Sequence, residues 1–371
     1  MPDHTYTTTD KAIEHDAIQS IPPPSRQTML IEHRLAENAL LSAYKSGSMH
    51  PCWMLVGPKG IGKATLAFRF AKFVLMNPDY TDPKVQEAKD LSITSVSPTG
   101  HQDRGIYSDL IHISREYDEK NKRFKTEITV SEIRRLIGLL GKTATKQEGW
   151  KIAIIDTADD MNDSSANALL KVLEEPPQRV IFLILVQNHG KVLRTICSRC
   201  CRLQLPLLTD EGLLVGLHRF SLLDKYNISE PSFVIRLANG SLRRAISLCV
   251  NDGIAILDEV LALTEQMPNF DVCHASELAS HVASAENTGL FPMCCAFIAY
   301  EAARRAKSAA ISRNLEEANR WAEAYTEIER IFTESKLYNL DQSSTILSLF
   351  MLFSDTSTMI GGSQVDPKPS K

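Results

Sequence analysis

The sequence predicts an α/β domain in which helices cover a parallel sheet, followed by a small helical domain and then by an all-helical domain. In the first half of the chain, short apolar runs alternate with helical patterns, which is typical of a parallel sheet with crossover helices. After Pro206 the strand signals stop. The length of 371 residues also exceeds one ordinary core and suits two or three domains.

Composition and charge indicate which classes of protein this chain resembles least. Hydrophobic residues make up 43% of the chain and charged residues 23%, and no apolar run approaches the ~18 residues of a membrane span. The N-terminus lacks a basic and then apolar signal segment, so we expect a cytoplasmic protein with no membrane partner. The net charge of −4 argues against a protein that grips duplex DNA alone.

Both ends of the chain are polar. Residues 1–27 end in Ile21-Pro22-Pro23-Pro24-Ser25, which favours a flexible, extended N-terminal arm. Residues 361–371 are expected to form a disordered tail. The α/β domain is therefore assigned to residues 28–206.

Five apolar runs are predicted to be the strands of this domain. The fourth is apolar without alternation, which marks a central strand buried on both faces. The runs are Trp53–Val56, Leu110–Ile113, Ile152–Ile155, Val180–Val186 and Cys201–Leu205.

A helix is predicted between the third and fourth runs. Its apolar residues recur at i, i+3, i+4 and i+7, with Ser164 as a possible N-cap and Pro176-Pro177 as the stop. They are Ala166, Leu169, Leu170 and Leu173.

The remaining chain is predicted to be helical. Residues 207–268 suggest a small second domain of short helices with a break at Asn239-Gly240, and residues 269–360 suggest a third, all-helical domain. The helices expected in this third domain are Ser276–Ala285, Phe291–Ala306, Leu315–Lys336 and Ser343–Phe353.

The run Gly57-Pro58-Lys59-Gly60-Ile61-Gly62-Lys63-Ala64-Thr65 nearly fits a P-loop. Gly57, Gly60 and Gly62 let backbone N–H groups turn toward phosphate, and Lys63 would reach the β- and γ-phosphates. An ordinary Gly-rich turn is the alternative. Loop, lysine and a strand-to-helix setting coincide here, and we favour the P-loop.

Ala64 departs from that motif, because a Ser or Thr hydroxyl normally holds Mg²⁺ at its position. Thr65 lies one place too far along. Nucleotide could still bind through the backbone and Lys63, so ATP or ADP is expected only at a weak or vestigial site.

A second acidic element follows the third apolar run. Asp156 ends that run as a Walker B aspartate does, where a carboxylate orients Mg²⁺ and water. Thr157 stands where a catalytic glutamate would follow, and a hydroxyl does not replace a carboxylate base. A plain loop residue is the alternative for Asp156, but the P-loop upstream favours the nucleotide-site interpretation.

The run Asn167–Pro177, NALLKVLEEPP, followed by Ser198-Arg199-Cys200, resembles bacterial DNA polymerase III clamp-loader subunits of the gamma/tau and delta-prime type, which are AAA+ proteins. The resemblance continues through Val130–Leu136 and Gly240–Ala245. It covers residues 28–250 well and the helical C-terminus loosely. It implies that residues 207–268 form a helical lid domain and residues 269–360 a helical C-terminal oligomerisation domain.

The resemblance implies roles for two arginines. Arg199, flanked by Ser198 and Cys200, corresponds to an arginine finger that reaches ATP bound on an adjacent subunit, and the alternative is a surface arginine before a strand. Arg243 corresponds to sensor 2, which faces the nucleotide of its own subunit, and the alternative is a plain helix arginine beside Arg244. The loop at Gln187-Asn188 lies where sensor 1 would be but lacks the usual Thr.

Zinc is not expected, although members of this family commonly carry a four-cysteine zinc module after the P-loop. This sequence has no cysteine from Lys72 to Gln187, and residues Asn77 to Ser108 are predicted to be a loop without metal. The cluster Cys197, Cys200 and Cys201 lacks a fourth nearby ligand, so no metal is predicted there either.

The resemblance also implies partners: three gamma or tau subunits and one delta subunit would join this chain in a ring through the C-terminal helical domains. ATP would drive loading of a sliding clamp onto primer-template DNA. The degraded catalytic set favours the delta-prime type, with little or no ATPase activity alone. The alternatives are a gamma/tau-type ATPase and an inert scaffold with a relic P-loop.

Overall fold

The computed structural model describes residues 18, 21–92, 109–118, 123–141, 149–226, 228, 231–250, 253–284 and 290–362. The chain divides into two compact units. The N-terminal unit comprises Met1–Phe220 with Gly240–Arg243, and the C-terminal unit comprises Ser221–Asn239 with Arg244–Lys371. Most of the predicted arm, 1–27, and of the predicted tail, 361–371, lies outside the described residues. The predicted boundary between a lid, 207–268, and a C-terminal domain, 269–360, stays a prediction.

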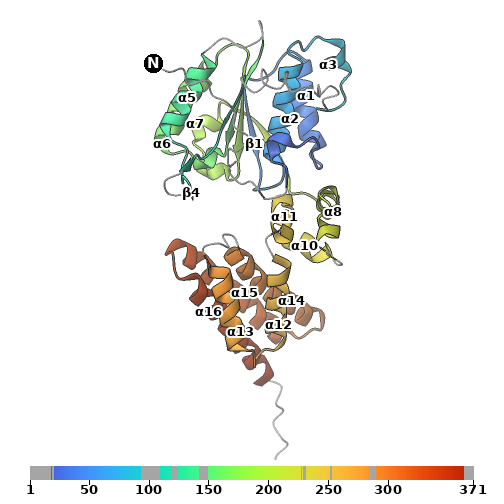
Figure 1. Cartoon of the computed structure of the whole chain (residues 1–371), viewed down its shortest axis with the longest axis vertical. Helices are drawn as coiled ribbons and strands as arrows, with labels where there is room; N and C mark the ends of the chain where they lie inside the picture. Colours follow the sequence, from blue (N-terminus) through green and yellow to red (C-terminus); the bar gives the residue numbers. More distant parts are fainter. Residues whose placement is uncertain are drawn as a thin grey trace, which may run out of the picture. The chain divides into compact units, whose positions relative to one another are not determined.

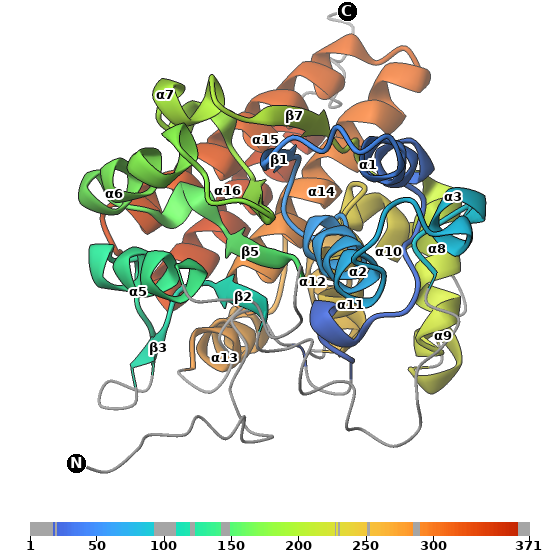
Figure 2. The ribbon, with the colours of Figure 1, turned by 90° about the horizontal axis from the view of Figure 1, so that it is seen from above.

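A five-stranded parallel sheet forms the centre of the N-terminal unit, as predicted. Its order is β2-β5-β6-β1-β7, and Figure 2 shows the sheet from above. The strands are β1 (Cys52–Val56), β2 (Leu110–Ile113), β5 (Lys151–Asp156), β6 (Val180–Val186) and β7 (Cys201–Gln204).

Strand β6 is the central strand, which confirms the interpretation of its unbroken apolar run. All seven of its residues are buried, and it pairs with β5 on one side and β1 on the other. Alternate residues serve opposite faces: Leu183 belongs to one core cluster and Ile184 to the other.

Helices cover both faces of this sheet (Figure 1). Helices α1, α2 and α3 contribute to the cluster that contains Leu183, whereas α5, α6 and α7 contribute to the cluster that contains Ile184. The bounds are α1 (Arg34–Lys45), α2 (Lys63–Met76), α3 (Pro83–Glu87), α5 (Val130–Leu140), α6 (Asp163–Glu174), α7 (Arg194–Cys197) and α8 (Asp210–Arg219).

Short elements complete the unit. Strands β3 and β4 form an antiparallel pair beside the main sheet, and three single turns are 3₁₀-helical. They are β3 (Tyr117–Asp118), β4 (Arg123–Phe124), η1 (Pro24–Arg26), η2 (Ala158–Asp160) and η3 (His189–Lys191).

Two local predictions need correction. The N-cap of α6 is Asn162 and not Ser164, because the Asn162 side chain accepts a hydrogen bond from the backbone N–H of Ser165. Within the predicted loop Asn77 to Ser108, α3 forms where Asp82 caps a turn that opens with Pro83. Residues 93–108 of that prediction lie outside the described part. The predicted stop of α6 before Pro176-Pro177 is confirmed.

The described secondary-structure elements of the C-terminal unit are all helices, as predicted. The predicted break at Asn239-Gly240 separates α10 from α11, and both residues have positive φ, 45° and 72°. None of the described helices is long and apolar enough to cross a membrane. The helices are α9 (Leu222–Lys225), α10 (Pro231–Ala238), α11 (Leu242–Val250, which starts in the N-terminal unit), α12 (Gly253–Glu265), α13 (Val272–Ala283), α14 (Leu290–Ile311), α15 (Leu315–Leu337) and α16 (Gln342–Gly362).

Candidate functional site: a P-loop and an arginine at opposite sheet edges

The predicted phosphate loop follows the carboxyl end of β1 and runs into α2. Gly60 and Gly62 have φ of +80° and +110°, a region that glycine adopts far more readily than other residues. Gly57 has a different reason to be glycine: a Cβ there would lie 2.5 Å from the carbonyl oxygen of Leu205. The loop therefore has the backbone shape that its glycines predicted.

Lys63 folds back across this loop. Its Nζ donates hydrogen bonds to the carbonyl oxygens of Gly57 and Pro58, each at 2.6 Å. Burial of the ammonium lowers its pKa to about 8, although the carboxylates of Asp156 and Asp159 act in the opposite direction. Lys63 thus closes the loop and keeps a positive charge beside the first turn of α2.

The metal-binding part of the site is incomplete. Loop backbone, Lys63 and the N-terminus of α2 form the donor set that suits a phosphate chain. Ala64, half-buried against the α1 and α2 core, brings no hydroxyl to it. Thr65 lies further along the first turn of α2. The residues present therefore fit nucleotide phosphates better than they fit a nucleotide with Mg²⁺.

Asp156 ends β5 at the same edge of the sheet as the phosphate loop. The Oγ1 of Thr157 donates to its Oδ1 at 3.1 Å, and the Nε2 of His112 lies 3.9 Å from its Oδ2. Burial pushes the pKa of Asp156 upward, but the hydrogen bonds and charge of His112, Thr157 and Lys63 outweigh it and hold that pKa below its usual range. Asp156 is accordingly an ionised carboxylate near Lys63.

Thr157 is held on two sides. It donates to Asp156, and its Oγ1 also accepts from the Nε2 of Gln187 at 3.2 Å. The backbone N–H groups of Gln187 and Asn188 both donate to Asp159, at 2.8 and 2.5 Å. The loop at Gln187-Asn188 is therefore tied to the residues after β5, through contacts of Asp159 that the sequence analysis missed.

The segment that begins α11 covers the outer side of the phosphate loop, within the N-terminal unit. The backbone N–H of Arg243 donates to the carbonyl oxygen of Gly60 at 3.1 Å, and Ser241 Oγ donates to that of Lys59 at 2.9 Å. A Cβ on Gly60 would lie 2.5 Å from the Cβ of Arg243. Arg243 thus lies beside the loop, and its correspondence to sensor 2 stays a prediction.

His33 is a second neighbour of the loop that sequence reasoning missed. Its Nε2 lies 2.8 Å from the carbonyl oxygen of Ile61, and burial lowers its pKa below 6.5. His33 has a left-handed φ of 56° and precedes α1. Because a lone histidine before a helix carries no motif, its contact with a loop 28 residues away is visible only in the fold.

Arg199 lies at the opposite end of the strands, next to their amino-terminal ends, whereas the phosphate loop lies at their carboxyl ends. The turn Ser198-Arg199-Cys200 directly precedes β7, whose first residue, Cys201, pairs with Trp53 near the start of β1. The phosphate loop follows the end of β1, and a strand of five residues spans about 15 Å. The structure therefore separates Arg199 from the P-loop of its own chain by about the length of a strand.

The guanidinium of Arg199 is partly exposed and anchored. Its Nη2 donates to Glu174 Oε1 at 2.6 Å, and its Nη1 donates to the carbonyl oxygen of Thr195 at 3.0 Å. Ser198 Oγ donates to the same Thr195 oxygen at 3.0 Å and lies 3.5 Å from the Nη1 of Arg199. Ser198 therefore shapes the turn that carries the arginine.

Cys200 faces inward from that turn. It packs against the α5 and α6 core, and its Sγ lies 2.8 Å from the Sγ of Cys52 at the start of β1. Both thiols are free. Across the described residues, no group of three or more His, Cys, Asp or Glu side chains is arranged to hold a metal ion.

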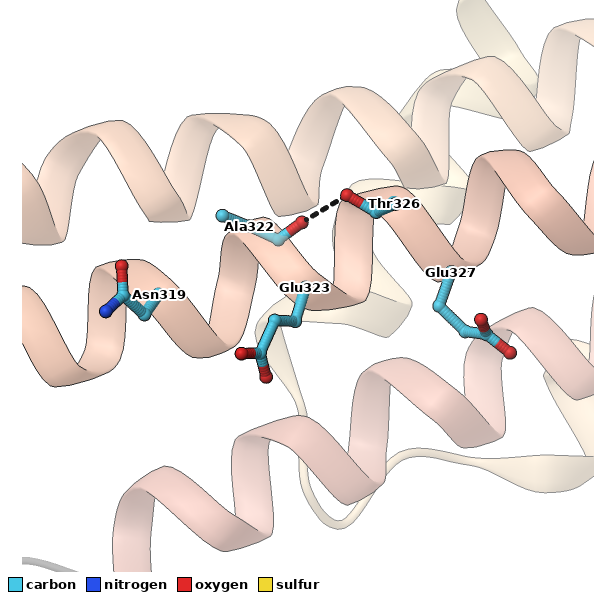
Figure 3. A pocket seen from close by; sticks show the side chains of 5 residues that line it. All are labelled: Asn319, Ala322, Glu323, Thr326 and Glu327. Carbon is cyan, nitrogen blue, oxygen red and sulfur yellow. Dashed lines mark hydrogen bonds between the residues drawn. The ribbon is translucent and has the colours of Figure 1, made fainter.

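A shallow pocket on α15 is separate from both groups (Figure 3). Thr326 Oγ1 donates to the carbonyl oxygen of Ala322 at 3.0 Å, and Glu327 pairs with Arg330 at 2.5 Å. The lining residues are Asn319, Ala322, Glu323, Thr326 and Glu327. The polar groups of Thr326 and Glu327 are thus paired within the helix itself.

Comparisons with known proteins concern mainly the N-terminal unit. Residues 32–209 match the family model described as DNA polymerase III, delta subunit. The chain is 29% identical over 227 residues to DNA polymerase III subunit gamma of Buchnera aphidicola subsp. Schizaphis graminum, a match that covers 61% of this chain and 58% of that protein.

A second relative is a different type of subunit. The chain is 31% identical over 172 residues to DNA polymerase III subunit delta′ of Pseudomonas aeruginosa, which covers 46% of this chain and 48% of that protein. The chain thus spans about half the length of these curated relatives.

Among solved structures, the chain is similar to a DNA polymerase III gamma subunit-related protein of Thermotoga maritima, at 16% identity and a TM-score of 0.40, over 86% of this chain and 99% of that one. The parallel sheet, the P-loop and the match over residues 32–209 agree with one another. Residues 32–209 are thus similar in sequence to DNA polymerase III clamp-loader subunits.

Proposed function

We propose that this chain is the delta-prime-type member of a clamp loader and lends Arg199 to ATP bound on a neighbouring gamma or tau subunit. The observation that most supports the proposal is the position of Arg199. It is partly exposed at the amino-terminal ends of the strands, whereas its own phosphate loop lies at their carboxyl ends. An arginine so placed is in a position to serve a nucleotide held by another chain. A guanidinium beside the γ-phosphate stabilises charge that develops as the bond breaks, an effect of about 10³ to 10⁵ in rate.

The chain's own nucleotide site supports the same assignment. Ala64 brings no hydroxyl for Mg²⁺, and Thr157 brings no carboxylate to polarise water. A neutral hydroxyl is not a general base, and that of Thr157 is held by Asp156 and Gln187. ATP or ADP bound at Lys63 would therefore be held and not hydrolysed.

Assembly with gamma or tau and delta subunits, through the C-terminal helices, belongs to the same proposal. The sliding clamp and primer-template DNA would be reached through that complex. The net charge of −4 fits a subunit that does not hold DNA by itself.

The test is the ATPase rate of a complex reconstituted with cognate gamma or tau, delta, clamp and primed DNA. Arg199→Ala is compared with wild type and with Arg202→Ala, which removes an exposed arginine from adjacent β7. We expect a large loss of rate for Arg199→Ala alone, with assembly unchanged by gel filtration. An unchanged rate in an intact complex would favour an inert scaffold.

A gamma/tau-type ATPase is the second candidate, favoured by the gamma relative and by the well-formed phosphate loop around Lys63. The isolated chain decides between the two. Robust ATP hydrolysis without partners would select this candidate, and its absence would count against it.

A further inference from the structure

We infer that Glu174 is the positioning residue for Arg199, an inference that rests on the proposed function. The two residues come from different elements: Glu174 is the last residue of α6, and Arg199 lies two residues beyond α7. Their ion pair, Nη2 to Oε1 at 2.6 Å, joins the turn before β7 to the end of α6.

The contacts of Arg199 leave part of its guanidinium available. Glu174, the carbonyl oxygen of Thr195 and Ser198 Oγ contact the two terminal nitrogens. A guanidinium has five N–H donors in a fixed plane, so donors remain for phosphate oxygens after these contacts are made. Glu174 and Thr195 together fix the direction in which those donors point.

This fixing has a physical effect on rate. An arginine side chain loses rotamer entropy when it is held in one geometry. Anchoring in the free subunit means that less of this entropy is lost when the neighbouring nucleotide arrives. The finger would then meet the γ-phosphate in its working orientation.

The position of Glu174 is unfavourable for the helix on its own. A carboxylate in the last turn of a helix lies near the negative end of the helix dipole. Glu174 has a side chain that is 51% exposed, and Arg199 one that is 34% exposed, so their ion pair contributes little to stability. The ion pair therefore serves mainly to orient the guanidinium of Arg199, and its removal is expected to leave the fold intact.

The experiment uses the reconstituted complex and three substitutions. Glu174→Gln removes the charge, and Glu174→Asp keeps the charge but withdraws the oxygen by one methylene. Glu175→Gln is the matched control, since the adjacent Glu175 has no hydrogen bond or ion pair to Arg199. Folding is checked by circular dichroism and assembly by gel filtration.

We expect Glu174→Gln to lower the kcat for ATP by about tenfold, equivalent to about 1.4 kcal/mol of transition-state stabilisation. The KM for ATP stays unchanged because Glu174 does not bind the substrate. Glu174→Asp is impaired to a similar degree, which a purely electrostatic role would not predict, and Glu175→Gln behaves as wild type.

A double-mutant cycle shows whether Glu174 acts through Arg199. In an Arg199→Ala background, Glu174→Gln should cause no further loss. A full additional loss in that background, or a kcat in Glu174→Gln equal to or above that of wild type, would overturn the inference. An unchanged rate in Arg199→Ala itself would instead overturn the proposed function, and this inference with it.

Discussion

Single atoms decide what the nucleotide site is able to do. Ala64 differs from serine by one oxygen, yet that oxygen is the usual protein ligand of Mg²⁺ in a P-loop. Thr157 has a hydroxyl, but Asp156 and Gln187 already engage it. Lys63, by contrast, is present at the motif position and donates hydrogen bonds to the carbonyl oxygens of Gly57 and Pro58. At this scale the residues present support the proposal of a site that binds phosphate without hydrolysing it.

Lys63 also predicts a pH dependence of stability. Its pKa in the folded chain is about 8, below the ordinary 10.5, so the unfolded chain binds more protons between these values. The cost of burying the ammonium is present in full below pH 8 and is relieved as the pH rises toward 10.5, so wild type gains stability in that window. The gain amounts to on the order of 3 kcal/mol.

Urea denaturation of wild type and Lys63→Met checks this prediction. The difference in free energy of unfolding, wild type minus variant, should rise between pH 8 and 10.5. The methionine variant removes only the titrating group, so other ionisations cancel in the comparison. A difference that stays flat across this range would show that Lys63 titrates normally.

At the scale of elements, the phosphate loop and the start of α11 are packed together. Gly60 has φ +80° and would bring a Cβ to 2.5 Å from both the Cβ of Arg243 and the Oγ of Ser241. We expect Gly60→Ala to cost about 2 kcal/mol or more, from backbone strain and overlap together.

Gly138→Ala is the control for that change. Gly138 lies in α5, and nothing lies within 4 Å of the Cβ that alanine would add. Alanine is the better helix former by about 1 kcal/mol, so this variant should be slightly more stable. Thermal denaturation should therefore show a lower Tm for Gly60→Ala and a higher Tm for Gly138→Ala than for wild type. A similar change in Tm for both variants would contradict the close packing at Gly60.

Much of the sheet follows from sequence because its signals are local. The apolar run Val180–Val186 identifies a strand buried on both faces without reference to any other segment. Likewise the glycines around Lys63 identify the loop. The cap of α6 was misplaced because Asn162 and Ser164 both have capping side chains, and only the backbone conformation selects Asn162.

The neighbours of the site were not predictable in the same way. His33 and Asp159 have no motif of their own, and the motif Asn167–Pro177 that contains Glu174 does not predict a contact with Arg199. Each of the three contacts a residue at least 25 positions away in the chain. Such contacts arise from the order of strands in the sheet, which brings distant loops to one edge. The role of Arg199 came from resemblance, whereas its distance from the P-loop comes from the register of β7 against β1.

At the scale of the whole molecule, a buried charge cluster holds the C-terminal unit together. Glu301 on α14 is fully buried and accepts hydrogen bonds from Arg304 and Arg305. Arg305 also donates to the carbonyl oxygen of Thr264 and lies over the rings of Trp321 and Phe353, at 5.0 and 4.8 Å. One arginine thus links α14 to α12, α15 and α16.

Glu301→Gln is expected to destabilise the chain by on the order of 3 kcal/mol, because it leaves the partly buried Arg305 without its counter-charge. The matched control is Arg330→Gln, which breaks exposed ion pairs with Glu327 and Glu334 and should change stability little. The measurement is the midpoint of urea denaturation. Equal midpoints for the two variants would show that the buried cluster contributes no more to stability than the exposed ion pairs of Arg330 do.

The proposed role of Arg199 is tested most directly by the first turnover of ATP in the reconstituted loader. Quench-flow measures the burst of ATP hydrolysis in this first turnover, before slower product release limits the observed rate. For Arg199→Ala we predict that the burst loses the amplitude of one ATP site, whose rate falls by about 10³ or more, while nucleotide binding and assembly are retained. A burst equal in amplitude and rate to that of wild type and Arg202→Ala would contradict the proposal that this chain lends its arginine to a neighbour.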